Sequence, residues 1–398
     1  MQKKDSWLLP EGIDEALPEQ AKQLERLRRI LLDAFACWGY QLVIPPLVDF
    51  LDSLLVAGGA DLEHQTFKLT DQLSGKLLGV RADMTPLVAR MDAHHLPHPR
   101  PARLCYYGTV LHTLGDPLEK TRAPMQIGAE LYGHAGLDSD FEIIGLMLET
   151  LSLSGVENAY LDLGHVAVYR ALVNMAGLNP AQEAELFTLL QRKARADLNQ
   201  FLAEQPLEAG KADWFRALPE LNGGLETLDR AGALYAGLNN PDIDRALNDL
   251  QTLAGKLRRA YPNLPLSFDL AELRGYHYHT GVAFAAFIPE IGREIARGGR
   301  YDNIGRAFGR ARPATGFSAD LKVLVNLFQA AAPDAQKEII FAPSGGDPGL
   351  HEAVRDLRAQ GRTVIQHLPE QIGDAAALGC NAILAWRDQQ WVVAALAV

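Results

Sequence analysis

Apolar residues recur with a helical period near the start of this chain. Between residues 19 and 37 one face is apolar, and the pattern ends before Gly39. The residues of this face are Leu24, Leu27, Ile30, Leu31, Ala34 and Phe35. We predict a helix here that leads into the strand-like run QLVI and then Pro45 and Pro46.

A period of two replaces the helical period over residues 126–133, which read QIGAELYG. Such alternation predicts a strand with one polar and one apolar face. The polar face would carry Gln126, Gly128, Glu130 and Tyr132, and the apolar face Ile127, Ala129 and Leu131. Strand-like runs alternate with turns from 81 to 133. We therefore predict an α+β fold with a mostly antiparallel sheet flanked by helices.

Two regions of the chain differ from this pattern. Residues 181–258 are rich in Ala, Leu, Glu, Gln and Arg and predict an inserted helical segment, with Asp242 as an N-cap beside Pro241. We interpret its charges as a solvated face, and a partner-binding role is the less favoured alternative. After a linker at 329–338, residues 335–398 predict a small α/β unit, in which Asp347 opens a helix and a hairpin turns across Arg387 and Asp388. Residues 1–328 would form the larger domain.

Composition restricts the class of protein without identifying it. A chain of 398 residues that is 48% hydrophobic is long enough to bury a large core in two or three domains. A formal net charge of −11 argues weakly against a dominant nucleic-acid surface. Three distant cysteines without CxxC or metal-ligand spacing, and no apolar run of membrane length, predict a cytoplasmic protein without a metal or cofactor.

The segment RGYHYHTG at 274–281 carries the densest candidate chemistry. The Arg274 guanidinium can hold a carboxylate by two parallel hydrogen bonds, and the tyrosines and histidines that follow offer flat faces and polar edges to a small ring. Those residues are Tyr276, His277, Tyr278 and His279. The plainer alternative is cation–π packing beside glycines.

Two further segments support a site for a small polar ligand. On the predicted strand, Gln126 and Glu130 flank Gly128, and we expect the glycine to leave room for a ligand because a buried carboxylate needs a partner. In GGRYDNI at 298–304, Tyr301 and its neighbours Arg300 and Asp302 either approach a ligand or pack the turn against adjacent strands.

Four segments resemble, in the same order, the histidine-binding segments of histidyl-tRNA synthetase. They are VRADMTPLVAR at 80–90, QIGAELYG at 126–133, LRGYHYHTG at 273–281 and GGRYDNI at 298–304. GYQLVIPPLVDF at 39–50 is similar to the dimer-forming first motif of class II synthetases, and PATGFSADLKVLVNL at 313–327 to their third motif. The resemblance spans roughly residues 10–328 and implies the class II synthetase fold.

The resemblance also implies a role for each matching residue. Asp83, Thr85 and Gln126 would face the ammonium group of histidine. Arg274 would face its carboxylate. The imidazole would be surrounded by Glu130, Tyr278, His279 and Tyr301, with His279 standing where the synthetases commonly have tyrosine.

The chain departs from the synthetases in the half of the site that binds ATP. His112 and Val323 stand where the second and third motifs carry phosphate-binding arginines, and Asp320 and Lys322 replace a glycine and a glutamate. Losing two guanidinium contacts removes hydrogen bonds to charged groups that are worth about 1.5–3 kcal/mol each. The end of the chain is similar to a shortened anticodon-binding domain, which makes tRNA binding unlikely. No catalytic residues are expected.

A protein that keeps histidine recognition and loses ATP chemistry resembles the synthetase paralogues that act as regulatory subunits of ATP phosphoribosyltransferase, the first enzyme of histidine biosynthesis. The resemblance implies L-histidine as ligand and a short catalytic subunit as partner. It also implies a homodimer, formed through residues 39–50, within a hetero-oligomer. Two alternatives remain open, an active histidyl-tRNA synthetase with divergent motifs and a standalone histidine-binding or tRNA-mimicking module.

Overall fold

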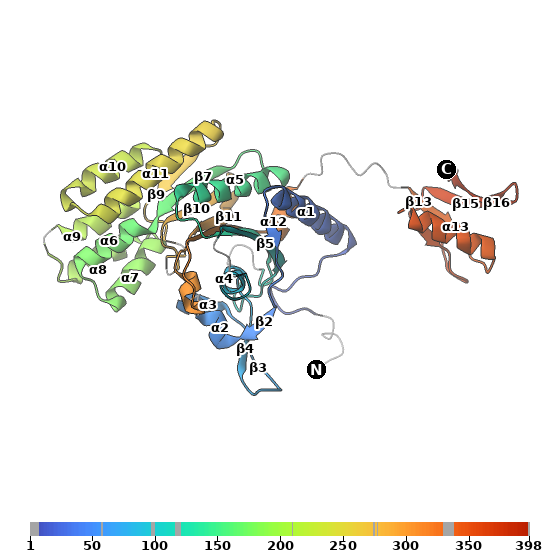
Figure 1. The fold of residues 1–398 in the computed structure, drawn as a ribbon, viewed down its shortest axis with the longest axis horizontal. Coiled ribbons are helices and arrows are strands. Elements are labelled where there is room, and N and C mark those ends of the chain that lie inside the picture. The colour runs from blue at the N-terminus through green and yellow to red at the C-terminus, as the bar shows by residue number, and fades with distance from the viewer. Residues whose placement is uncertain are drawn as a thin grey trace. The chain divides into compact units, whose positions relative to one another are not determined.

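The computed structural model describes residues 8–56, 59–96, 100–115, 121–208, 210–273, 275–276, 278–328 and 338–396. The chain forms two compact units, residues 1–329 and residues 330–398. Figure 1 shows the larger unit as a sheet with helices on both faces and the smaller unit as a separate sheet with one long helix. Among the described residues, two hydrophobic cores lie in the larger unit and one in the smaller unit.

Within the described residues, the larger unit contains a nine-stranded sheet with the order β1-β5-β6-β12-β11-β10-β7-β9-β8. Pairing is antiparallel except between β1 and β5 and between β7 and β9. The strands are β1 Gln41–Leu42, β5 Ala102–Thr109, β6 Met125–Tyr132, β7 Tyr160–His165, β8 Asn222–Gly223, β9 Leu266–Asp269, β10 Val282–Ile288, β11 Ile291–Arg300 and β12 Ala314–Asp320. The predicted mostly antiparallel sheet is therefore confirmed.

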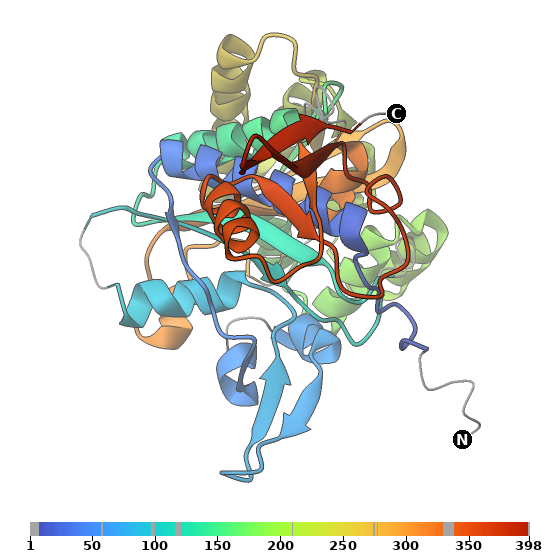
Figure 2. The same ribbon diagram turned by 90° about the vertical axis from the view of Figure 1, so that its right-hand side faces the viewer.

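The alternation predicted for residues 126–133 divides the larger unit into two cores. Ile127, Ala129 and Leu131 of β6 belong to the main core, which includes residues of α1 (Pro18–Cys37), α5 (Leu137–Leu153) and α12 (Leu321–Leu327). Tyr132, on the opposite face, belongs to a smaller core that includes residues of α4 (Thr85–His94) and η3 (Ile304–Phe308). Figures 1 and 2 agree in placing α1 and α5 on one side of the sheet and α4 on the other.

A group of helices lies near β7, β9 and β8, at one end of the nine-stranded sheet (Figure 1). It comprises α6 Val166–Ala176, α7 Pro180–Gln191, α8 Arg195–Glu204, α9 Lys211–Ala217, α10 Glu226–Tyr235 and α11 Pro241–Ala260. The predicted cap of α11 was wrong. Asn240, not Asp242, caps α11, because its side chain accepts hydrogen bonds from the Asp242 and Ile243 amides while Pro241 occupies the first turn.

A second, three-stranded sheet of the larger unit has the order β2-β4-β3 and is wholly antiparallel. Its strands are β2 Val48–Phe50, β3 Lys68–Thr70 and β4 Leu77–Val80, and the short helices α2 Leu51–Leu55 and α3 Gly59–Gln65 lie between β2 and β3. In Figure 2 the β3–β4 hairpin extends away from the nine-stranded sheet.

The smaller unit is a four-stranded sheet with the order β14-β13-β15-β16. Its elements are β13 Ile339–Ala342, α13 Pro348–Ala359, β14 Thr363–Gln366, β15 Ala382–Arg387 and β16 Gln390–Ala395. The Asp347 side chain caps α13 by accepting from the Leu350 amide, as the sequence predicted. The hairpin turns one residue later than predicted, because Asp388 and Gln389 take positive φ angles of 46° and 63° and Arg387 still pairs with Gln390.

Candidate ligand-binding site

A buried carboxylate, that of Glu130 on β6, lies at the centre of the site. Only 1% of the residue is exposed. One carboxylate oxygen accepts hydrogen bonds of 3.0 Å from the hydroxyls of Thr85 and Tyr106, and the other accepts one from the Tyr301 hydroxyl. Three other chain segments therefore converge on Glu130, and their hydroxyls satisfy the hydrogen-bonding requirement of a buried polar group.

Burial raises the pKa of Glu130 to about 8. The three hydroxyl donors, of which Tyr301 has the largest effect, lower this pKa, and the nearby charge of Asp83 raises it further. The carboxyl group therefore changes charge close to neutral pH. A group with that property in a polar cluster is suited to share a proton with an imidazole ring.

A second hydrogen-bonded group joins the start of α4 to β6. The side-chain nitrogen of Gln126 donates to the Asp83 carboxylate at 2.9 Å, and the Thr85 amide donates to the same oxygen at 3.2 Å. The Met84 amide in turn donates to the Gln126 side-chain oxygen at 2.9 Å. The Asp83 carboxylate and the Gln126 side-chain amide are thereby fixed next to each other, and such oxygen acceptors are suited to an ammonium group.

Aromatic rings form another side of the site. The ring centroids of Tyr278 and Tyr301 lie 6.4 Å apart, and those of Tyr278 and His279 4.5 Å apart, each pair edge to face. Burial raises the pKa of Tyr278 to about 12, so its hydroxyl stays protonated at neutral pH. The three rings and Glu130 together present apolar faces and polar edges.

The structure thus brings most of the residues predicted from the sequence into one region. Hydrogen bonds join Asp83 to Gln126 and Glu130 to Thr85 and Tyr301, and ring contacts add Tyr278 and His279. Arg274 and His277 lie outside the described residues. Ligand contact by the whole set remains a prediction.

Tyr106 is a member of the site that the sequence analysis missed. It lies directly opposite Gly128 in the β5–β6 ladder, and it is fully buried. A Cβ atom on Gly128 would come within 2.7 Å of the Tyr106 hydroxyl. The expectation that Gly128 leaves room for a ligand was therefore wrong, since the glycine accommodates Tyr106. The signal was a tyrosine two residues before Gly108 on the preceding strand, but the pairing register decides which residue meets Gly128.

The two alternatives for the GGRYDNI turn are resolved residue by residue. The Arg300 guanidinium is buried and donates two hydrogen bonds to the Asp140 carboxylate, at 3.1 and 2.8 Å, and one to the Ser139 hydroxyl at 2.8 Å. Asp302 accepts from the Ala314 amide at 3.0 Å. Arg300 and Asp302 therefore pack the turn, and Tyr301 between them reaches Glu130.

The residues that replace the synthetase ATP contacts take part in contacts within the chain. His112 makes a 2.9 Å hydrogen bond to the Ala82 carbonyl through its ring nitrogen, and Val323 packs against the main core. Asp320 caps α12 and also accepts from the Met125 amide at 3.0 Å.

Lys322 and Arg122 both contact the N-terminal segment of the chain. The Lys322 ammonium lies 2.8 Å from the Asp14 carboxylate and donates to the Ala123 carbonyl at 2.8 Å. The Arg122 guanidinium donates to the Glu11 carbonyl at 3.2 Å, and the Arg122 amide to the Gly12 carbonyl at 2.7 Å. Both cations therefore contact the chain itself.

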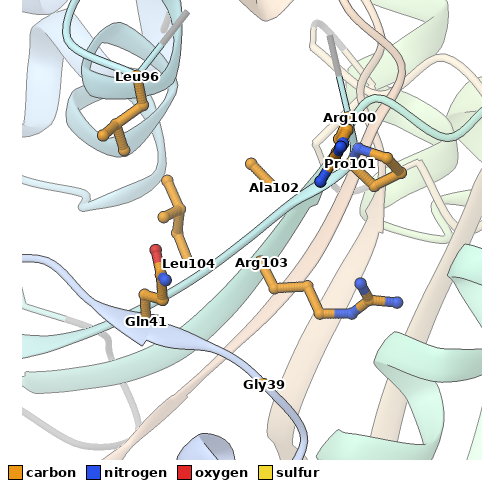
Figure 3. A pocket seen from close by; sticks show the side chains of 8 residues that line it. All are labelled: Gly39, Gln41, Leu96, Arg100, Pro101, Ala102, Arg103 and Leu104. Atoms are coloured by element: carbon orange, nitrogen blue, oxygen red, sulfur yellow. The ribbon is translucent and has the colours of Figure 1, made fainter. Parts of the chain in front are cut away.

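A separate cavity of about 450 Å³ lies along the outer edge of the nine-stranded sheet, where β1 pairs with β5 (Figure 3). It is lined by Gly39, Gln41, Leu96, Arg100, Pro101, Ala102, Arg103 and Leu104. None of the predicted site residues belongs to this lining. The Arg103 guanidinium already binds the Glu142 carboxylate by two hydrogen bonds of 2.6 and 2.7 Å, which argues against its binding a ligand in this cavity.

Two general features of the described residues bear on the kind of site. No group of three or more histidine, cysteine, aspartate or glutamate side chains among them is arranged to hold a metal ion. None of the helices in the described part of the chain combines the length and apolarity needed to cross a membrane.

Comparison with known proteins follows the division into two units. Residues 12–324 match the histidyl-tRNA synthetase family, and residues 337–394 match the C-terminal domain of the HisZ subunit of ATP phosphoribosyltransferase. The chain is 56% identical over 398 residues to the ATP phosphoribosyltransferase regulatory subunit of Thioalkalivibrio sulfidiphilus, covering 99% of both chains. It is 55% identical over 394 residues to that of Methylococcus capsulatus, covering 99% of this chain and 97% of the relative.

Solved structures with a similar fold belong to the same two groups of proteins. A regulatory subunit/histidyl-tRNA synthetase from Bacillus halodurans has a TM-score of 0.80 at 26% identity and covers 94% of this chain and 96% of its own. A histidyl-tRNA synthetase from a Nostoc species shares the fold, with a TM-score of 0.75 at 17% identity over 98% and 97% of the two chains.

The fold is thus that of the class II synthetases of the histidyl type, which confirms the fold class predicted from the sequence. Within that class, the chain belongs to the family of ATP phosphoribosyltransferase regulatory subunits, the paralogues that serve histidine biosynthesis. The resemblance stated from the sequence motifs is therefore confirmed as well.

Proposed function

We propose that this chain binds free L-histidine at the Glu130 site and thereby controls a short catalytic subunit of ATP phosphoribosyltransferase. The observation that carries the proposal is the pair of hydrogen-bonded groups on β6. Asp83 and Gln126 form one, and Glu130 and Tyr301 form the other. A zwitterionic amino acid with a titratable ring requires both kinds of group.

The residues divide the ligand between them. Asp83, Thr85 and Gln126 face the ammonium group, because a carboxylate and neutral oxygens are the acceptors that three N–H donors need. Glu130 and Tyr301 meet the imidazole edge, and Tyr278 and His279 its face. Arg274 holds the ligand carboxylate.

The chain has no catalysis of its own in this proposal. His112 and Val323 occupy the positions of the two phosphate-binding arginines of the synthetases, and each makes a contact within the protein instead of binding phosphate. The second candidate function, an active histidyl-tRNA synthetase, requires histidine-dependent pyrophosphate exchange. We expect exchange no higher than in a reaction without protein, with an active histidyl-tRNA synthetase as positive control. Exchange clearly above the blank would favour the second candidate.

A homodimer formed through residues 39–50 is part of the proposal. Ile44 is 75% exposed, and its apolar neighbours in that segment are also exposed, namely Leu42, Leu47, Val48 and Phe50. A contiguous exposed apolar stretch of this kind is typical of a protein interface. The cavity of Figure 3 adjoins the same segment through Gly39 and Gln41.

Regulation then follows from linkage. A site that binds an end product without chemistry acts by favouring one state of the complex, and the coupling is typically about 1–3 kcal/mol. The complex would be cytoplasmic, since the three cysteines of this chain are unpaired and a reducing compartment suits them. The C-terminal unit would not read tRNA.

Titration calorimetry with L-histidine, on the chain alone and with its catalytic partner, tests the central claim. Arg274→Ala should weaken binding most, on the order of 2–5 kcal/mol, because the ligand carboxylate then loses its partner. Arg245→Ala is the matched control, since Arg245 is 72% exposed on α11. Absence of histidine binding in both preparations would refute the proposal. Histidine binding without any association with the catalytic subunit would instead favour the standalone module.

A further inference from the structure

We propose that Tyr276, Arg170 and Glu183 are positioning residues for the histidine site, and that they couple its occupancy to helix α7. The inference rests on the proposed function and adds to it the route by which the ligand alters a distant element. The three residues hold the turn formed by residues 275–276 and 278–280, which carries Tyr278 and His279, against α6 and α7.

Tyr276 is the anchor of this turn. Tyr276 is only 6% exposed, and its hydroxyl donates a 2.6 Å hydrogen bond to the Glu183 carboxylate on α7. The ring packs edge to face on Tyr169 of α6, with centroids 5.0 Å apart, and lies 5.7 Å from Phe187 of α7. A phenol so enclosed has one position relative to the two helices, and the adjacent backbone follows it.

Arg170 of α6 holds the turn at both ends. Its guanidinium lies 5.1 Å from the centroid of the Tyr276 ring, and one nitrogen donates to the carbonyls of Tyr276, at 3.3 Å, and His279, at 3.0 Å. Charge-assisted bonds to these two carbonyls restrain the backbone of Tyr276 and of His279. Tyr278 directly precedes His279 in the chain.

The turn is tight, so a shift at its base moves the rings that it carries. The amides of Tyr278 and His279 both donate to the Gly275 carbonyl, at 3.0 and 2.7 Å. Gly275 has φ 71°, and a Cβ atom there would come within 2.7 Å of the His279 ring, so the position requires glycine. On the other side, the Thr280 amide donates to the Arg300 carbonyl at 2.7 Å.

Contacts therefore connect α7 to Glu130, the carboxylate proposed to meet the ligand imidazole. Glu183 contacts Tyr276, the turn joins Tyr276 to Tyr278, and Tyr278 packs on Tyr301, which donates to Glu130. A ligand that fixes the Tyr278 ring must reduce the motion of the turn and hence of α7. The α7 helix in turn contacts the C-cap residue of α8 through a 2.7 Å hydrogen bond between Gln182 and Gln205.

The test uses two phenol-to-phenyl variants from one cluster. Tyr276→Phe removes the bond to Glu183 and leaves the ring. Tyr169→Phe is the matched control, because it also removes one bond to α7, a 3.2 Å contact with the Glu183 carbonyl, and keeps the ring that packs on Tyr276. We expect Tyr276→Phe to weaken histidine affinity about tenfold and Tyr169→Phe less than twofold, at similar melting temperatures. Glu183→Gln, which keeps an acceptor, should bind better than Glu183→Ala.

Hydrogen exchange separates this inference from the proposed function. Without any ligand, the amides of residues 278–280 should exchange faster in Tyr276→Phe and Arg170→Gln than in the wild type or Tyr169→Phe. With histidine, α7 should gain protection in the wild type and lose that gain in Tyr276→Phe, while α13 of the smaller unit serves as reference. Unchanged exchange at 278–280 in both variants overturns the positioning role whatever the ligand is. Histidine binding without any change in α7 overturns the coupling, and no histidine binding at all overturns the proposed function.

Discussion

The hydroxyl of Thr85 donates a 3.0 Å hydrogen bond to the carboxylate of Glu130, which lies 45 residues later in the chain. This bond joins the first residue of α4 to the middle of β6. It also joins the two halves of the proposed histidine site, because the Thr85 amide donates to Asp83. The groups proposed to face the ligand ammonium and those proposed to face its ring therefore form one connected hydrogen-bond network, in which we expect a change at one end to alter the other.

The proton of this network should shape the pH dependence of histidine affinity. The pKa of Glu130 is raised to about 8, and that of a free imidazole is about 6.5. A neutral imidazole bound to a protonated carboxyl holds one proton between the two groups. We expect calorimetric affinity to be highest between those two values, to fall below the lower one as the free ligand gains a second proton, and to fall above the upper one as Glu130 loses its own.

Glu130→Gln separates the two limbs of that profile. The amide keeps the shape and cannot ionise, so affinity should no longer decline as the pH rises through 8, while the acidic decline remains. A profile of the variant with the same alkaline decline as the wild type would contradict the assignment of Glu130 to the ligand ring.

The same carboxyl group makes a distinct prediction for the stability of the ligand-free protein. The folded state keeps the Glu130 proton between pH 4.5, the ordinary pKa of a glutamate, and its raised pKa of about 8, where the unfolded state has released it. The free energy of unfolding should therefore fall as the pH rises through that window, by at most about 1.4 kcal/mol per pH unit. Urea titrations of the wild type and Glu130→Gln, compared at each pH, measure the slope that this one group contributes.

Asp162→Asn provides the control for that measurement. Burial raises the pKa of Asp162 to about 6, so its window ends two units earlier than that of Glu130. The difference between wild type and this variant should change only below pH 6, where folded and unfolded proton counts differ. A Glu130 difference that is flat between pH 6 and 8 would show that the carboxyl is ionised in the folded state.

How far the sequence alone could predict this site depends on the distance over which each contact is made. Local patterns were sufficient for the two faces of β6 and for the Asp347 cap. The Asn240 cap was equally local, since the residue before a proline in the first turn takes that position. Tyr106 was out of reach, because its place opposite Gly128 depends on the register of two strands separated by a loop.

Thr85 and Asp83 illustrate a different limit. Nothing in the spacing of VRADMTP indicates that its side chains meet β6, and only the resemblance to the synthetases placed them in the site. The structure supplies the physical reason, which is that the start of α4 lies against the polar face of β6 through the bonds of Thr85 and Gln126. Long-range packing of this kind has no periodic signature in the sequence.

A charge placed in the predicted dimer interface should separate the subunits. Ile44→Lys introduces an ammonium group where a side chain that is 75% exposed in the single chain would become buried between two copies. Burying an unpaired charge costs several kcal/mol, so sedimentation or light scattering should show monomers at micromolar concentration. Ile372→Lys, at a position that is 96% exposed in the smaller unit, is the control and should leave the assembly unchanged. A dimeric Ile44→Lys protein would place the interface elsewhere.

Reciprocity between histidine and the catalytic partner is the strictest prediction of the regulatory proposal. If histidine changes the affinity of this chain for the short catalytic subunit by some factor, the subunit must change the affinity for histidine by the same factor, because both describe one thermodynamic cycle. We expect a factor of about 5–150, which corresponds to coupling of about 1–3 kcal/mol. Histidine titrations at saturating and zero partner, and partner titrations at saturating and zero histidine, provide the four constants. Arg274→Ala should abolish the histidine effect on partner binding while leaving the histidine-free association constant at its wild-type value. If the partner leaves the histidine constant unchanged and histidine leaves the partner constant unchanged, occupancy of the Glu130 site does not regulate the enzyme, even if histidine binds there.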